Sequence, residues 1–276
     1  MQKSRLIEVL RSFSEREIRQ FEEYLNSPYH NKLEDLSRLY KHIAFALEQK
    51  IDAALDKTYV YEKLFPKRPY KDVKIRLLMS DLLKHAERFL TIEQHLNDQA
   101  TAEVYLARTY RRRQLTKSFR HTLKTARNRL QKKPSYDTPT QYQQSQLYEE
   151  EYLFLLEENR QAGYDLQVWH DTVSHFFIAE TLRQVCALLT RQRVAEKSYN
   201  FLLLADILKQ IETRPVLLDI PVIQVYYHSY HTLVGTQNDE HFRQLKDGII
   251  HYGIGFPQAE LKEIYTHAIN HCIRQN

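Results

Sequence analysis

The residues best suited to charged contacts lie on one side of a helix predicted over residues 115–133. The cations Arg113, Lys117, Arg120, Lys124 and Arg127 follow one another at intervals of four, three, four and three residues. Side chains with this spacing share one face of an α-helix. Leucine, phenylalanine and alanine positions form a second stripe on the same helix. We therefore expect the helix to rest on a core and to expose a row of cations.

This row belongs to a wider basic segment. Residues 104–136 contain eleven Lys or Arg and no Asp or Glu, so the rest of this +5 chain carries a net charge of −6. A row of cations can contact successive phosphates with little base discrimination, which makes residues 108–133 a candidate for binding nucleic acid or another polyanion. An acidic protein partner is an alternative, and so is a solvated face. The row could also pair with acidic neighbours within the chain, namely Glu149, Glu150, Glu151, Glu157 and Glu158.

A second candidate surface is a cluster of aromatic and imidazole side chains in the second half of the chain. It consists of Tyr226, Tyr227, His228, Tyr230 and His231. Tyrosine combines a large apolar ring with a polar tip, so it serves in helix packing and equally in binding surfaces. If these residues line a concave groove, the groove would suit an extended peptide or a partner helix. Packing between helices is the alternative.

Catalytic and metal-binding patterns are sparse. His228 and His231, like His267 and His271, are spaced to share a helix face, but a third ligand and a His-Glu-x-x-His motif are missing from the sequence. Cys186 lies in an apolar run that suits a buried helix face. Walker-type, dinucleotide-binding and calcium-binding loops are likewise absent from the sequence. We expect a non-enzymatic protein without a metal or cofactor.

The elements that carry these residues are predicted to be helices. The first 162 residues contain no glycine, and glycine is what most tight hairpin turns and phosphate-binding loops require. Apolar residues recur with the helical period, and a capping box of Ser14 and Glu17 starts the second helix, while Asn31 is expected to cap the third. Further helices are predicted at about 71–95, 99–113, 115–133, 140–160, 165–180 or longer, 180–193, 197–212, 221–234, 239–251 and 257–274. The fold class is all-α.

The polar stretch 132–140 contains two prolines and predicts a domain boundary. We therefore expect an N-terminal helical unit over 1–133, which includes the basic helix, and a helical-repeat region over 134–276. Pro221 and Pro257 each open a predicted helix and lie 36 residues apart, the step of a helix-turn-helix repeat. The second half is thus predicted to stack antiparallel helix pairs as an α-solenoid. It resembles tetratricopeptide repeats in period and composition, without their Trp, Leu-Gly and Tyr signature.

Three local segments carry a further resemblance. They are Leu25-Asn26-Ser27-Pro28-Tyr29-His30-Asn31, Leu64-Phe65-Pro66-Lys67-Arg68-Pro69-Tyr70 and Arg76-Leu77-Leu78-Met79-Ser80-Asp81-Leu82-Leu83. With these segments, roughly the first 95 residues resemble the opening of a family of uncharacterised bacterial all-helical proteins, and the final segment around Tyr265 is also similar. The resemblance implies a helical fold and assigns no activity to any residue. Members continue with further helical repeats, which implies that this chain is a shorter member or a fragment.

Composition points to a cytoplasmic protein. The N-terminus lacks the apolar run of a signal peptide, and the longest apolar runs are far shorter than the roughly 20 residues that span a bilayer. Two cysteines distant in sequence do not form a secreted disulfide framework. The predicted function is protein–protein interaction or assembly, and the alternative is nucleic-acid association through the basic helix. A terminal repeat without a polar cap would expose an apolar face, which predicts a homodimer or a C-terminal continuation.

Overall fold

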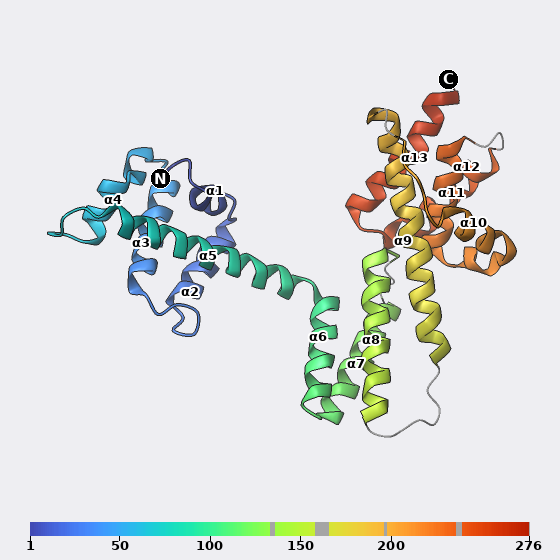
Figure 1. Ribbon diagram of the computed structural model, residues 1–276, viewed down its shortest axis with the longest axis horizontal. Helices are drawn as coiled ribbons and strands as arrows, with labels where there is room; N and C mark the ends of the chain where they lie inside the picture. The colour runs from blue at the N-terminus through green and yellow to red at the C-terminus, as the bar shows by residue number, and fades with distance from the viewer. Residues whose placement is uncertain (133–135, 158–165, 196–197, 236–238, 276) are drawn as a thin grey trace. The chain divides into compact units, whose positions relative to one another are not determined.

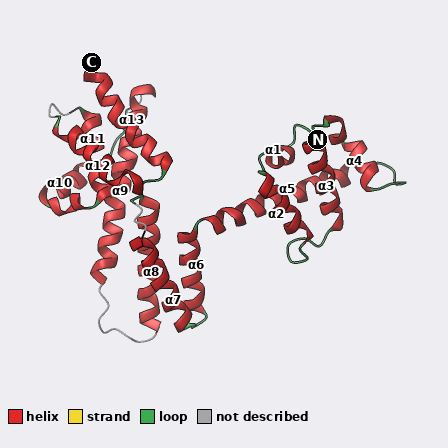
Figure 2. Cartoon of the chain, turned by 180° about the vertical axis from the view of Figure 1, so that it is seen from behind, coloured by secondary structure: helices red, strands yellow, loops and turns green. Residues whose placement is uncertain are grey.

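Figure 1 shows the computed structural model, which describes residues 1–132, 136–157, 166–195, 198–235 and 239–275. Across these residues the regular structure consists of thirteen α-helices and three short 3-10 helices, and no strand occurs among them (Figure 2). The prediction of an all-α fold is confirmed. The backbone polar groups are therefore satisfied mainly within the helices that contain them.

The chain divides into two compact units, Met1–Gln99 and Ala100–Asn276. The boundary predicted between residues 133 and 134 falls on residues 133–135, which lie outside the described residues. The helix that carries the cationic row belongs to the second of the two compact units.

The first unit contains five α-helices arranged around an aromatic core. They are α1 (Arg5–Arg11), α2 (Glu15–Asn26), α3 (Glu34–Glu48), α4 (Lys57–Leu64) and α5 (Asp72–Asn97), with a 3-10 helix η1 (Asp52–Leu55). The long helix α5 contacts each of the other four α-helices. The ring centroid of Phe21 lies 5.4 Å from that of Phe13 and 5.2 Å from that of Phe89. These edge and tilted contacts join the loop after α1, helix α2 and helix α5 in one core.

The two caps predicted for this unit have different outcomes. The capping box before α2 is confirmed, since Ser14 Oγ accepts from the Glu17 backbone and the Glu17 carboxylate accepts from the Ser14 backbone. The prediction for Asn31 is wrong, because α3 begins after Leu33 and has no side-chain cap. Asn31 is buried instead, and its Nδ2 donates to the carbonyl of Leu25 at 2.9 Å. Its amide thus satisfies the last turn of α2, and its Oδ1 accepts from the backbone N–H of Leu33 at 2.8 Å.

The second unit contains the remaining helices. They are α6 (Gln99–Arg112), α7 (Thr116–Lys132), α8 (Thr138–Glu157), α9 (Leu166–Ala195), α10 (Leu204–Thr213), α11 (Pro221–Val234), α12 (Glu240–Tyr252) and α13 (Gln258–Gln275), with 3-10 helices η2 (Pro215–Asp219) and η3 (Gly253–Gly255). Pro221 occupies the first position of α11 as predicted. The break predicted near residue 180 is wrong, because α9 runs through it. No proline or glycine interrupts α9, and Ala179, Leu182 and Cys186 keep one continuous buried face.

Two cores hold this unit together. The first lies among α6, α7 and α8 and includes Val104, Ala107 and Leu123. The second lies among α9, α10, α11, α12 and α13, with α11 in contact with α9, α12 and α13. Helix α8 packs along α9 and joins the two groups, as both views show (Figures 1 and 2). The position of the basic helix is therefore set by α6 and α8.

Candidate functional site

The apolar stripe of α7 fixes which of its side chains face solvent. Phe119 and Ala126 are fully buried, and the Phe119 ring stacks on Phe154 of α8 with ring centroids 4.4 Å apart. Leu123 is buried on the same stripe, whereas Leu115 at the start of the helix is exposed. The helix therefore rests on its apolar face, and the opposite face points to solvent.

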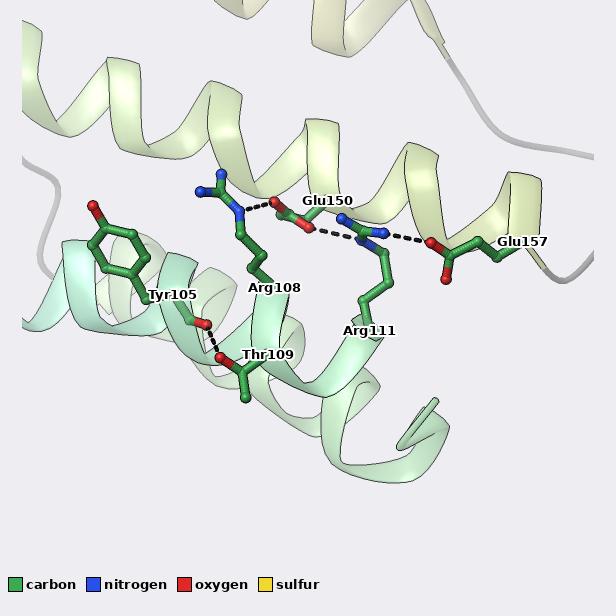
Figure 3. Close-up of polar contacts among 6 residues, drawn as sticks. All are labelled: Tyr105, Arg108, Thr109, Arg111, Glu150 and Glu157. Atoms are coloured by element: carbon green, nitrogen blue, oxygen red, sulfur yellow. Dashed lines mark hydrogen bonds and ion pairs between the residues drawn. The ribbon is translucent and has the colours of Figure 1, made fainter. Parts of the chain in front are cut away.

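Two arginines of the basic segment are used inside the fold. Arg108 Nε donates to Glu150 Oε1 at 2.5 Å, and Arg111 Nε donates to the other carboxylate oxygen of Glu150 at 2.8 Å (Figure 3). Arg111 also pairs with Glu157. The Glu150 side chain is only 2% exposed, so its charge is compensated by two guanidinium groups in a water-poor setting. The hydrogen bond to Glu150 raises the pKa of Arg108 above its ordinary value.

Two further arginines pair at the edges of α7. Arg127 pairs with Glu151 of α8, and Arg129 Nη2 donates to Glu103 Oε2 of α6 at 3.0 Å. The expectation that acidic neighbours pair with the basic segment therefore holds for Glu150, Glu151 and Glu157. Glu158 lies outside the described residues. The Glu103 pair was not predicted, although this residue is the last carboxylate before the basic segment begins.

The remaining cations of the row are exposed. Arg113, Lys117 and Lys124 have no ion pair within the part of the chain that the structure describes, and we call these three residues the α7 cationic face. Arg113 lies in the turn before α7, where Gln114 has a positive φ of 56°, so it does not continue the helical spacing of the row as predicted. Arg120 is also exposed, and its guanidinium carbon lies 5.8 Å from the centroid of the Phe154 ring. With a rise of about 1.5 Å per residue, Lys117 and Lys124 are about 10 Å apart along the helix axis. All five cations of the predicted row are thus exposed, and two of them, Arg120 and Arg127, also contact side chains of α8.

The tyrosine and histidine cluster lies on α11, most of whose residues are buried. Tyr226, Tyr227 and His228 are buried, at 1%, 8% and 7% exposure. Tyr230 and His231 are partly buried, and the Tyr226 hydroxyl donates to Glu260 of α13 at 2.6 Å. The cause is that α9, α12 and α13 all pack against α11. These side chains fill the core there instead of lining an open groove, which corresponds to the packing alternative.

The second histidine pair is also buried. His267 and His271 face the core from α13, and His271 Nε2 lies 3.5 Å from the Asp239 carboxylate. Over the residues that are described, no group of three or more His, Cys, Asp or Glu side chains is arranged to hold a metal ion. Cys186 is fully buried, and burial raises the pKa of its thiol, so its thiolate is disfavoured.

The first unit contains a groove of about 950 Å³ between α2 and α3. Its apolar lining includes Phe13, Ile18 and Phe45. Its rim charges pair with one another, as in Arg11 with Asp52 at 3.4 Å and Lys41 with Glu22 at 3.3 Å. The groove therefore has no charge excess that would select a ligand.

Comparison with protein-family models, with curated proteins and with solved structures finds no match to this chain. No helix within the described ranges is both long enough and apolar enough to cross a bilayer. The resemblance to the uncharacterised bacterial family stays a prediction.

Proposed function

We propose that this chain is a non-enzymatic interaction protein whose α7 cationic face binds an acidic surface of a protein partner. The observation that carries the proposal is that some cations of the basic segment form ion pairs within the fold, whereas others are exposed without an ion pair among the described residues. Arg108 and Arg111 form ion pairs with Glu150, whereas Lys117 and Lys124 are exposed on a helix that is packed against α8. A packed helix places Lys117 and Lys124 at a fixed spacing for complementary carboxylates, so only their side chains have to be ordered on contact.

Exposed apolar side chains on α6 and in the turn before α7 favour a protein as the partner. Leu115 is 44% exposed directly between Arg113 and Lys117 along the chain. On the preceding helix, Tyr105 and Leu106 are also exposed. Protein interfaces combine such apolar and aromatic contacts with a polar rim, whereas contacts to a phosphate backbone come from charged and polar groups.

The test compares two triple charge reversals of equal net change. One variant carries Arg113→Glu, Lys117→Glu and Lys124→Glu, and the control carries the same reversal at exposed cations of the first unit, Lys3, Arg16 and Lys32. Binding to polyglutamate is measured by fluorescence anisotropy at low and physiological salt, because such contacts weaken as salt rises. We expect the α7 variant to lose at least about tenfold in affinity and the control to lose little. Equal losses in both variants would show that net charge alone is responsible.

The second candidate is nucleic-acid binding, favoured by the regular spacing of cations along α7. A phosphate backbone would give affinity that falls steeply with salt and depends little on base sequence. The same variants are tested against a labelled single-stranded RNA and a DNA duplex of unrelated sequences. Tighter binding to these probes than to polyglutamate, lost in the α7 variant, would select this candidate over the first. Binding to none of the three probes at low salt contradicts both candidates.

The repeat character of the second unit is part of the same proposal. In a helical repeat, the first helix of one pair contacts its own partner and the first helix of the next pair. Helix α11 contacts both α12 and α13, which supports an assignment of α11 and α12 as one pair and α13 as the start of another. Repeats of this kind serve as scaffolds for partners, in keeping with an interaction protein.

A further inference from the structure

Helices α11 and α12 bring three imidazole rings into contact inside the second unit. His228 and His231 lie about one turn apart on α11, and His241 lies in the first turn of α12. His228 Nδ1 is 3.0 Å from His241 Nδ1, and the His231 and His241 rings stack with centroids 4.2 Å apart and planes inclined by 14°. We call these residues the histidine cluster.

The Nδ1 contact sets a limit on the number of protons that the cluster can hold. A hydrogen bond between two Nδ1 atoms needs one hydrogen, so one ring donates while the other accepts. Protonation of both rings would place two N–H groups against each other and break the bond. Protonation of His231 and His241 together would stack two positive rings. The closed arrangement is therefore compatible with neutral rings and is opposed by successive protonation.

We propose that the histidine cluster is a proton-sensitive joint that holds α12 on α11 near neutral pH and releases α12 when its rings become protonated. This inference is independent of the proposed function, which depends on α7.

The groups around the cluster favour protonation of its rings less than burial and the neighbouring imidazoles oppose it. Tyr227 on α11 contacts all three rings, and its hydroxyl stays neutral because burial raises its pKa. Glu240 on α12 is the carboxylate that favours protonation of His228 and His241.

The other packed elements contribute groups that act elsewhere. Tyr230 on α11 contacts the His231 ring and lies close to Cys186 of α9, which stays a neutral thiol. Glu212 on α10 acts on Tyr227, and His271 on α13 pairs with Asp239.

The expected direction follows from the change in proton affinity on opening. Burial, together with the neighbouring imidazoles, lowers the pKa of His228 and of His231 to about 4. Burial also lowers the pKa of His241. An opened cluster would bind protons near the ordinary value of about 6.5, so the closed state is most stable above that pH and loses stability as pH falls toward 4.

The test is hydrogen exchange of the full chain, followed by mass spectrometry at about pH 7 and pH 5 and corrected for the intrinsic exchange rate. We expect the opening constant of α12 peptides to rise at least about tenfold between these pH values, with α9 peptides changing less. The double variant His228→Asn with His231→Phe keeps an amide donor toward His241 and an aromatic ring for stacking, but removes two titrating groups. It should flatten the pH response of α12.

The control is His251→Asn, on the exposed side of the same helix, and it should retain the wild-type response. An unchanged pH response in the double variant, or equal opening of α9 and α12 in the wild type, would overturn the proposal. If the double variant does not fold, the pKa values of the histidine rings in the wild type are measured by NMR titration. The single variants are used to assign the histidine signals. We expect His228 and His231 to titrate below about pH 5, and midpoints near 6.5 for both would refute the joint.

Discussion

Arg111 joins two carboxylates of α8 through the two sides of its guanidinium group. Its Nε donates to Glu150 at 2.8 Å, and its Nη1 pairs with Glu157. Because these two carboxylates lie about two turns apart on α8, the contact fixes the register of α6 along α8 as well as their separation. The apolar core among α6, α7 and α8 is small, so this polar contact contributes specificity that few apolar side chains could provide.

Glu150→Ala should destabilise the second unit by about 3 kcal/mol, because it leaves Arg111 without its buried counter-charge. Unfolding in urea is followed through the fluorescence of Trp169, the single tryptophan, whose ring lies 5.2 Å from that of Tyr152 between α9 and α8. Glu149→Ala is the matched control, since the neighbouring carboxylate is exposed. It should change the unfolding free energy by less than about 0.5 kcal/mol. A similar loss for both variants would show that Glu150 has no special role.

Gly255→Ala should destabilise the same unit by about 1–3 kcal/mol through steric overlap. A Cβ at this position would overlap the Tyr136 ring, and that ring is held by an edge contact with Tyr252 and by the hydrogen bond from its own backbone N–H to the Gly255 carbonyl. Gly253→Ala is the control, because its Cβ would lie 3.5 Å from Leu261, an ordinary contact. Urea unfolding of the two variants gives the comparison, and equal stability of both would mean that Tyr136 moves aside without cost.

Local patterns predicted the elements well where the deciding contacts lie within a few residues. The capping box of Ser14 and Glu17 and the proline at the start of α11 are both decided by neighbours in the chain. The prediction that Asn31 caps the third helix was wrong because its amide donates to the Leu25 carbonyl. That interaction depends on the path of the loop between α2 and α3. Helix α9 continues through residue 180 because no proline or glycine interrupts it. The apolar pattern alone did not decide between one long helix and two shorter ones.

The sequence predicted the residue types of the candidate surfaces, but it did not predict which of their side chains are exposed. Within α7 the spacing correctly separated the buried Phe119, Leu123 and Ala126 from exposed cations, whereas Arg113 and Leu115 lie before the helix and are both exposed. The sequence does not show which arginines form ion pairs within the fold. Glu150, for example, is 42 residues from Arg108 and contacts it only when α6 and α8 pack together. Burial of Tyr226 likewise depends on three helices covering α11, and no local pattern encodes that arrangement.

Ser14→Ala should destabilise the first unit by about 1 kcal/mol by removing the cap of α2. The control is Ser80→Ala on the exposed face of α5, where alanine should be neutral or slightly favourable. Hydrogen exchange of α2 peptides measures the local effect. Hydrogen bonds from Ser14 lower the pKa of Glu17, so the cap stabilises α2 above the ordinary pKa of a glutamate and is lost as pH falls through the lowered value. A cap that survives protonation of Glu17 would contradict this account.

Glu180→Gln should weaken the second unit by about 2–3 kcal/mol at neutral pH. Burial alone would raise the pKa of Glu180, but hydrogen bonds from Arg183 and Thr138 outweigh burial and lower the pKa from 4.5 to about 2. A lowered pKa gives stability that is complete above about 4.5 and is lost as pH falls toward 2. The wild type should therefore approach the stability of the variant in acid, as measured by urea unfolding between these pH values. Asp206→Asn, an exposed carboxylate of α10, serves as the control, and it should change the difference between neutral and acidic pH less than Glu180→Gln does. A constant gap between wild type and Glu180→Gln across this range would mean that the contact with Arg183 depends on shape and not on charge.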